Sequence, residues 1–205
     1  MPTTNPNDFI ELLEVFSIAL TNGLLDKSEV VKWADKIITS DSEPEYFIIE
    51  LSLCGHKAVN DIISLINAFI GKNKPKVSGR VILGFLYRQY LAGKITLRKV
   101  VSTINWIVWQ ADLTNEEKSF MYGLDEDFYC AEDGIYGTVE AVEKETIRFL
   151  ETYKDFQIDN YNDWKKIDET INNKIALLAE TIRQEQAELI KMQTEQKKKK
   201  WWKLN

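Results

Sequence analysis

The chain has 205 residues, of which 44% are hydrophobic and 28% are charged, and its formal net charge is −6 at pH 7. These fractions are typical of a globular protein with a packed core. Only nine Gly and four Pro occur, and few β-branched runs alternate at period two, which argues against a β-sandwich or barrel.

The apolar residues of the first half follow helical spacing, recurring every three or four positions. A first helix is predicted over Phe9–Leu20 and ends near Gly23, and a second, capped by Asp26 or Ser28, covers Val30–Ile38. A third is predicted to start with Pro44 in its first turn and to cover Tyr46–Cys54 up to Gly55, with a buried strand as the alternative.

Helical spacing continues through the second half of the body. Between the first of these segments and the next lies a polar link, Gly71–Gly79, which is predicted to be a loop. Thr114 and Glu117 form a capping-box pattern at the start of one segment. The segments predicted to be helical are Ala58–Ile70, Val81–Ala92, Leu97–Ala111, Asn115–Tyr129 and Val139–Tyr153.

A pattern of glycine and apolar residues occurs twice at an offset of 70 residues. Gly23 and Gly93 are each followed by apolar pairs at the same distances, Val30 with Val31 and Val100 with Val101. A duplicated helical hairpin explains this pattern and favours a stacked helical array. Two unrelated amphipathic hairpins that share a period by chance are the alternative.

The C-terminal part is predicted to be one long helix, from about Asn162 to Lys199. Its apolar residues form a narrow seam from Trp164 to Met192, with polar residues on either side. We expect its first half to pack on the body and its second half to project into solvent or to pair with another chain. The sequence therefore predicts an all-α fold of helical hairpins, packed as a bundle or short stacked array over residues 1–156. The long helix and its basic–aromatic tail occupy residues 157–205.

No pattern of catalytic or cofactor-binding residues was found. The chain has one histidine, His56, at a predicted helix boundary, where a capping or solvent-facing role is expected. Zinc-binding spacings, phosphate-binding glycine loops and the GxSxG nucleophile motif are missing from the sequence. We therefore expect a protein that is not an enzyme and needs no cofactor or metal.

The N-terminal residues and the two cysteines bear on location. The first eight residues are polar and lack the segments of a secretory signal, and apolar stretches such as Val100–Ala111 are too short or interrupted to span a bilayer. Cys54 and Cys130 fit a reducing compartment. The sequence thus predicts a cytoplasmic protein, with Cys54 as a small core residue.

Charge is distributed unevenly along the chain. Residues 191–205 contain six Lys and one Glu, which leaves 20 basic and 31 acidic side chains in the first 190 residues. Such an acidic body repels nucleic acid and attracts cationic partners.

The most acidic stretch, Leu124–Thr138, has five carboxylates within nine residues. Its spacing excludes an EF-hand, because Cys130 stands where the loop needs glycine. A solvated helix end followed by a Gly134–Gly137 turn is one interpretation. The other is an acidic docking surface with aromatic anchors, and an enzyme that uses these carboxylates with a divalent metal is a third, weaker alternative. The predicted partner-binding residues are Asp125, Glu126, Asp127, Tyr129, Glu132, Asp133 and Tyr136.

The C-terminal tail mixes lysine with tryptophan. This composition is compatible with an anionic membrane surface, with nucleic acid, with the acidic body of the protein itself, or with a solvated terminus. The predicted tail contacts are Lys197, Lys198, Lys199, Lys200, Trp201 and Trp202.

Three segments carry a resemblance to a known class of protein: GLLDKSEVVKWAD, YLAGKITLRKVV and LDEDFYCAEDGIYGTVEAVEKE. Over about residues 8–155 the chain resembles the small acidic helical immunity proteins of bacterial polymorphic toxins. The resemblance implies stoichiometric binding to a toxin domain, which an acidic surface would steer if that domain is cationic. The alternative function is a structural or assembly adaptor that uses the long C-terminal helix and its tail.

Overall fold

The structure is a computed structural model that describes residues 5–40, 43–71, 78–111 and 113–202, with the backbone alone for residues 78, 186, 189, 193 and 196–202. It is 82% helical, and no strand occurs among the described residues, which confirms the predicted all-α class. The helices are η1 (Pro6–Phe9), α1 (Ile10–Thr21), α2 (Lys27–Ser40), α3 (Tyr46–Ser52), η2 (Leu53–His56), α4 (Val59–Ile70), α5 (Ser78–Leu91), α6 (Leu97–Gln110), α7 (Asn115–Glu132), α8 (Val139–Glu151), η3 (Ile158–Asp163) and α9 (Trp164–Trp202).

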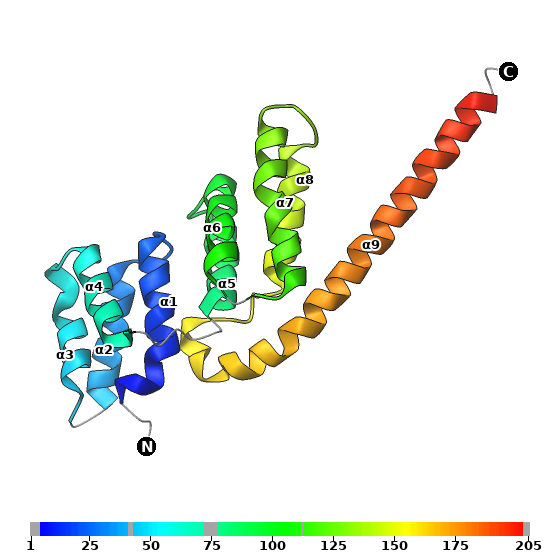
Figure 1. The fold of residues 1–205 in the computed structure, drawn as a ribbon. Coiled ribbons are helices and arrows are strands. Elements are labelled where there is room, and N and C mark those ends of the chain that lie inside the picture. The colour runs from blue at the N-terminus through cyan, green and yellow to red at the C-terminus, as the bar shows by residue number, and fades with distance from the viewer. Residues whose placement is uncertain (1–4, 41–42, 72–77, 112, 203–205) are drawn as a thin grey trace.

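The helices form a row of antiparallel layers, from α1–α4 at one end through α5 and α6 to α7 and α8 (Figure 1). Helix α1 packs on both α4 and α5, α5 packs on α8, and α6 packs on α7. Helix α9 passes beneath the last hairpin and then leaves the body (Figure 1). The fold is therefore a short stacked array with one long C-terminal helix.

Three hairpins share the same glycine turn. Gly23, Gly93 and Gly134 have φ angles of 65°, 67° and 68°, a region that favours glycine because it has no Cβ. In each turn the next residue donates its N–H to a carbonyl five positions back, at 2.8 Å, 3.0 Å and 2.8 Å, as in a Schellman motif. Helices α2 and α6 also begin and end 70 residues apart, so the offset seen in the sequence is a repeat of local structure.

Equivalent residues of the first two hairpins fill the core. Leu12, Leu13 and Phe16 of α1 are each at most 1% exposed, and Ile82, Leu83 and Leu86 of α5, 70 positions later, are fully buried. Cys54 is fully buried as predicted, and burial raises the pKa of its thiol. Removal of such residues from water is the main favourable contribution to folding.

The predicted loop Gly71–Gly79 ends earlier than expected, because α5 already begins at Ser78. Residues 72–77 lie outside the described part. Gly84, inside α5, allows the helix to approach the chain after α8: a Cβ there would lie 2.5 Å from the Tyr153 carbonyl oxygen. The glycines of this segment therefore serve close helix packing, a tertiary requirement that a turn-based interpretation of Gly79 could not foresee.

Other boundaries also differ from the predictions. Pro44 precedes α3 instead of lying in its first turn, because Glu45 is the N-cap. Gly55 does not end the segment but lies within η2. Helix α7 continues three residues past Tyr129 to Glu132. The expected capping box of Thr114 and Glu117 is present.

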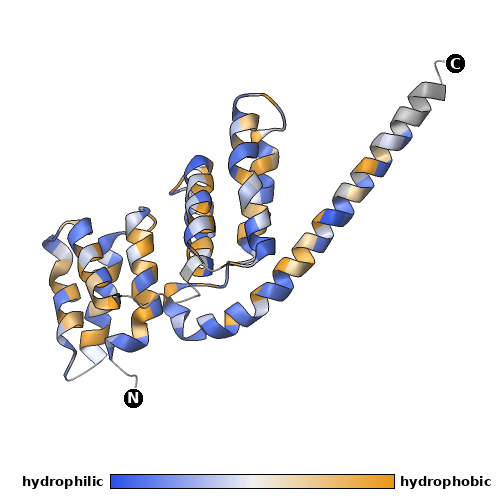
Figure 2. Cartoon of the chain, viewed as in Figure 1, coloured by the Kyte–Doolittle hydropathy of each residue, from blue (hydrophilic) through white to orange (hydrophobic). Residues whose placement is uncertain are grey.

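Helix α9 is attached to the body only through its first part. Trp164, Ile171 and Ile175 are at most 2% exposed, and the Trp164 indole donates a hydrogen bond to the Gln157 carbonyl at 2.8 Å. Farther along, Ile190 and Met192 are 64% and 59% exposed. Figure 2 shows that apolar and polar residues alternate along the projecting part.

Candidate protein-binding surface

The acidic segment forms the C-terminal half of α7. Asp125, Glu126, Asp127 and Glu132 lie within the helix, and Asp133 is its C-cap. The C-terminus of a helix carries partial negative charge, so carboxylates there are electrostatically unfavourable unless a cation compensates them. Both sequence interpretations are partly met: the helix does end in a glycine turn, and its last turns do present acidic side chains.

One face of this half-helix forms a ladder of contacts with α6. The Arg98 guanidinium bonds the Glu132 carboxylate. One turn further, the Asn105 amide donates to Asp125 Oδ2 at 3.1 Å. The ladder ends where the rings of Trp109 and Tyr122 meet edge to face, with centroids 5.4 Å apart. These side chains share a face because residues three or four apart on a helix are neighbours.

Arg98 is the cation that compensates the end of α7. Its guanidinium lies 5.6 Å from the ring centroid of Phe128 and 5.5 Å from that of Tyr129, and hydrogen bonding to Glu132 raises its pKa. The α6–α7 seam therefore has a fixed arrangement of charge and rings.

Large aromatic side chains remain exposed along this seam. Trp109 is 69% exposed, Tyr122 51%, Tyr129 45% and Trp106 39%. Trp, Tyr and Arg are the residue types that most often dominate the energy of protein interfaces. We call the following residues the acid–aromatic face: Arg98, Trp106, Trp109, Tyr122, Asp125, Tyr129 and Glu132.

The predicted partner-binding residues divide between two sides of α7. Asp125, Tyr129 and Glu132 belong to the acid–aromatic face, whereas Asp127 accepts a hydrogen bond from the Tyr136 hydroxyl at 3.1 Å on the side of α8 and α9. Hydrogen bonds with the Cys130 thiol and with Asp127 raise the pKa of Tyr136. Glu126 and Asp133 are exposed. The structure therefore does not gather the seven residues into one surface.

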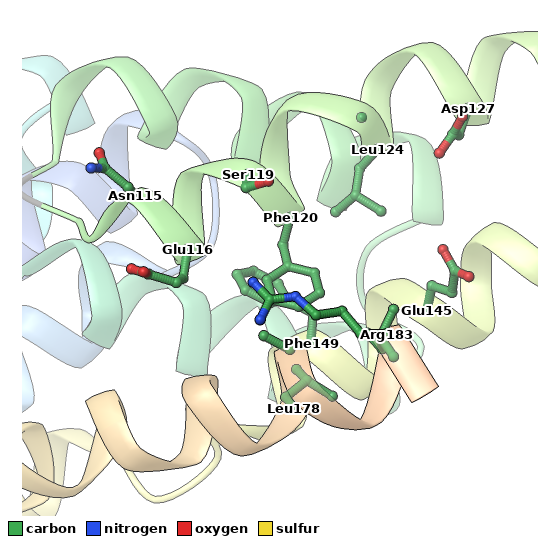
Figure 3. Close-up of a pocket in the computed structure, with 13 residues that line it drawn as sticks. Asn115, Glu116, Ser119, Phe120, Leu124, Asp127, Glu145, Phe149, Leu178 and Arg183 are labelled. Atoms are coloured by element: carbon green, nitrogen blue, oxygen red, sulfur yellow. The ribbon is translucent and has the colours of Figure 1, made fainter. Parts of the chain in front are cut away.

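A groove of about 470 Å³ lies between α7, α8 and α9 (Figure 3). Its apolar walls come from Phe120, Leu124, Phe149, Leu178 and Ile182. Carboxylates of Glu116, Asp127 and Glu145 stand around it, together with the guanidinium of Arg183. This acidic-rimmed, apolar-walled groove matches a segment that combines cationic and apolar side chains.

The groove is held in shape by a buried polar network that sequence analysis missed. Arg80 of α5 forms two hydrogen bonds of 2.9 Å with Glu117 of α7. It also donates to Asp168 and Asn172 of α9, both at 2.7 Å. The Tyr153 hydroxyl donates to Glu117 at 2.8 Å.

Burial and hydrogen bonding act in opposite directions on the ionisable groups of this network. Burial alone would lower the pKa of Arg80 and raise that of Glu117, but their mutual hydrogen bonds reverse both shifts. Burial and the Glu117 charge raise the pKa of the Tyr153 hydroxyl. The available sequence signal was a single arginine next to the apolar run Val81–Leu83, because a charge in such a position needs a partner.

The remaining predicted residues are placed as follows. His56 is the exposed last residue of η2, in agreement with the expected helix boundary. The tail predicted to make contacts, Lys197–Trp202, continues α9, but its side chains lie outside the described part. Among the described residues, no three His, Cys, Asp or Glu side chains gather so as to hold a metal ion. The described helices include none with both the length and the apolar character needed to cross a membrane.

Comparisons of the chain with protein-family models, with curated proteins and with solved structures found no match.

Proposed function

We propose that this chain is a binding protein that docks on a cationic protein partner through the acid–aromatic face and neutralises it by stoichiometric binding. The observation that carries the proposal is the exposure of Trp109, Tyr122 and Tyr129 beside carboxylates on one seam. Exposed aromatic clusters of this kind are uncommon on surfaces that meet only water.

The ladder between α6 and α7 supports this proposal in a second way. A binding surface gains affinity when its side chains are already ordered, because less conformational entropy is lost on association. The Arg98–Glu132 pair, the Asn105–Asp125 hydrogen bond and the ring contact of Trp109 fix their rotamers before a partner arrives. The net negative charge of the body would speed the encounter with a cationic partner.

The resemblance to immunity proteins makes a toxin domain the first partner to test. Each neighbouring open reading frame is expressed with and without this chain, and cell growth is measured. We expect one product to arrest growth and this chain to relieve the arrest.

A face variant, Trp109→Ala with Tyr129→Ala, should lose that protection. The matched control is Tyr46→Ala with Leu53→Ala, which removes side chains that are 75% and 64% exposed at the opposite end of the array. Loss of protection in the control, or full protection by the face variant at equal expression, contradicts the proposed surface.

Helix α9 favours a second candidate function, an assembly adaptor. The helix has 39 residues, and its distal part projects away from the body (Figure 1). A chain truncated after Leu189 separates the two functions: an inhibitor keeps its partner, whereas an adaptor that works through the distal helix loses it.

A further inference from the structure

The face of α9 that packs on the body continues beyond it. Ile171 and Ile175 are buried, and Leu178 and Ile182 are half-buried at the groove. At the next position of this face, Glu185 accepts hydrogen bonds of 2.7 Å and 3.0 Å from Arg148 of α8. Beyond Glu185, no described side chain of the body meets α9.

The uncovered part keeps the spacing of a coiled-coil seam. Positions 182, 185, 189, 192 and 196 follow each other in steps of three and four, and they carry Ile, Glu, Leu, Met and Gln. The described side chain at position 192 is 59% exposed. Such a seam is marginal in water as a single helix and is stabilised when a second helix covers it.

Charge along this part of α9 is strongly polarised. Residues 177–188 contain three Glu and one Arg, whereas residues 191–200 contain five Lys and one Glu. Two parallel copies would place like charges side by side. Two antiparallel copies would place the acidic half of each helix beside the basic half of the other.

We propose that two copies of this chain pair antiparallel through the projecting part of α9, centred between Ile190 and Lys191. In this register Leu189 faces Met192 of the second copy, Glu185 faces Gln196, and Ile182 faces Lys199. The overlap of residues 181–200 extends over about 30 Å at 1.5 Å per residue.

The groove accounts for what the end of the second helix meets. In this register, residues 199–202 of one copy lie opposite residues 179–182 of the other, and Ala179 and Ile182 line the groove. The lysines then meet the rim carboxylates of Glu116 and Glu145, and the two tryptophans meet the apolar walls. The tail cannot reach the groove of its own chain, because the straight helix carries it about 27 Å past Arg183.

A charge-swap experiment on full-length protein tests the pairing. The tail variant replaces Lys197, Lys198, Lys199 and Lys200 with Glu, and the groove variant is Glu116→Lys with Glu145→Lys. Sedimentation equilibrium should give a dimer for the wild type and a dissociation constant at least tenfold higher for each variant. An equimolar mixture should regain dimer, because each tail then meets a groove of opposite charge.

The matched control reverses exposed charges on α2, with Lys32→Glu and Lys36→Glu, and it should dimerise like the wild type. A wild type that stays monomeric at every concentration overturns the proposal, including the case in which it binds phosphatidylserine vesicles through its tail. A mixture that stays monomeric overturns the role of the groove.

Cysteine cross-linking tests the orientation, in a Cys130→Ser background that removes the half-buried native thiol. Glu185→Cys and Gln196→Cys should form a disulfide when mixed and none when each is oxidised alone. Cross-linking of each variant with itself indicates a parallel pair and overturns the proposed register.

Discussion

Arg80 Nε and Nη2 each donate a hydrogen bond of 2.9 Å to one oxygen of the Glu117 carboxylate, inside the core between α5 and α7. The Glu117 side chain is fully buried, and that of Arg80 is 8% exposed. Through Asp168 the same guanidinium also bonds α9. One ion pair thus fixes the hairpin that carries the acid–aromatic face to the helix that closes the groove.

Replacement of Arg80 should destabilise the protein severely. Arg80→Met leaves the Glu117 carboxylate buried without its cation, which costs about 3–5 kcal/mol of unfolding free energy. The double variant Arg80→Met with Glu117→Gln should lose less, because the uncompensated charge is gone. Denaturant unfolding measures both. Arg98→Met, at an exposed ion pair, is the control and should change stability far less; equal losses in Arg80→Met and Arg98→Met contradict the role of burial.

Stability should fall at both extremes of pH. The folded protein lowers the pKa of Glu117, so its stabilising contribution is present above about pH 4.5 and is lost as the pH falls through the folded-state value. It raises the pKa of Tyr153, so that contribution is present below about pH 10 and is lost above it. Melting temperatures across pH give both limbs. Glu117→Gln should flatten the acid limb and Tyr153→Phe the alkaline limb, and an unchanged profile in either variant refutes that assignment.

Two Gly→Ala substitutions inside helices should have opposite effects. At Gly84 the new methyl would lie 2.5 Å from a backbone oxygen, which cannot rotate away, and the overpacking costs about 1–3 kcal/mol. At Gly123 in α7 the nearest atom is Asp127 Oδ2 at 3.6 Å, an ordinary contact. Alanine should therefore stabilise there by up to about 1 kcal/mol through helix propensity. The same sign at both sites would contradict the close approach at Gly84.

The body should fold without the distal end of α9. Truncation after Leu189 removes residues with no described hydrogen bond or ion pair to the body, so the melting temperature should stay within a few degrees of that of the full chain. A second truncation after Asp163 is the contrast, since it removes Trp164 and Ile171 from the core and should unfold the last hairpin. An insoluble protein after the shorter truncation would indicate that the tail packs on the body.

Charge reversal on the two sides of α7 should separate its roles. Asp125→Lys with Glu132→Lys reverses the acid–aromatic face, whereas Asp127→Lys alters the groove side. With a cationic partner in hand, the first variant should slow association at low salt by at least tenfold and weaken its salt dependence. Association rates at low and high salt decide between them. Equal effects from both variants would mean that long-range charge, and not this face, guides the encounter.

Local patterns in the sequence determined the helices of this protein. The steps of three and four in apolar residues, the glycines at 23, 93 and 134, and the capping box at Thr114 depend on neighbours within about one helical turn, so they can be recognised without a fold. The same local information predicted the long C-terminal helix and the burial of Cys54.

Only the tertiary structure decided which residues meet. Arg80 and Asp168 are 88 positions apart, and no local spacing indicates that they bond. The acidic cluster was predicted as one surface because its members are adjacent in sequence, but a helix turns about 100° per residue and sends Asp125 and Asp127 to different sides. Burial of a charge and the choice of a helix face depend on how helices pack, and that packing is set by contacts far apart in the chain.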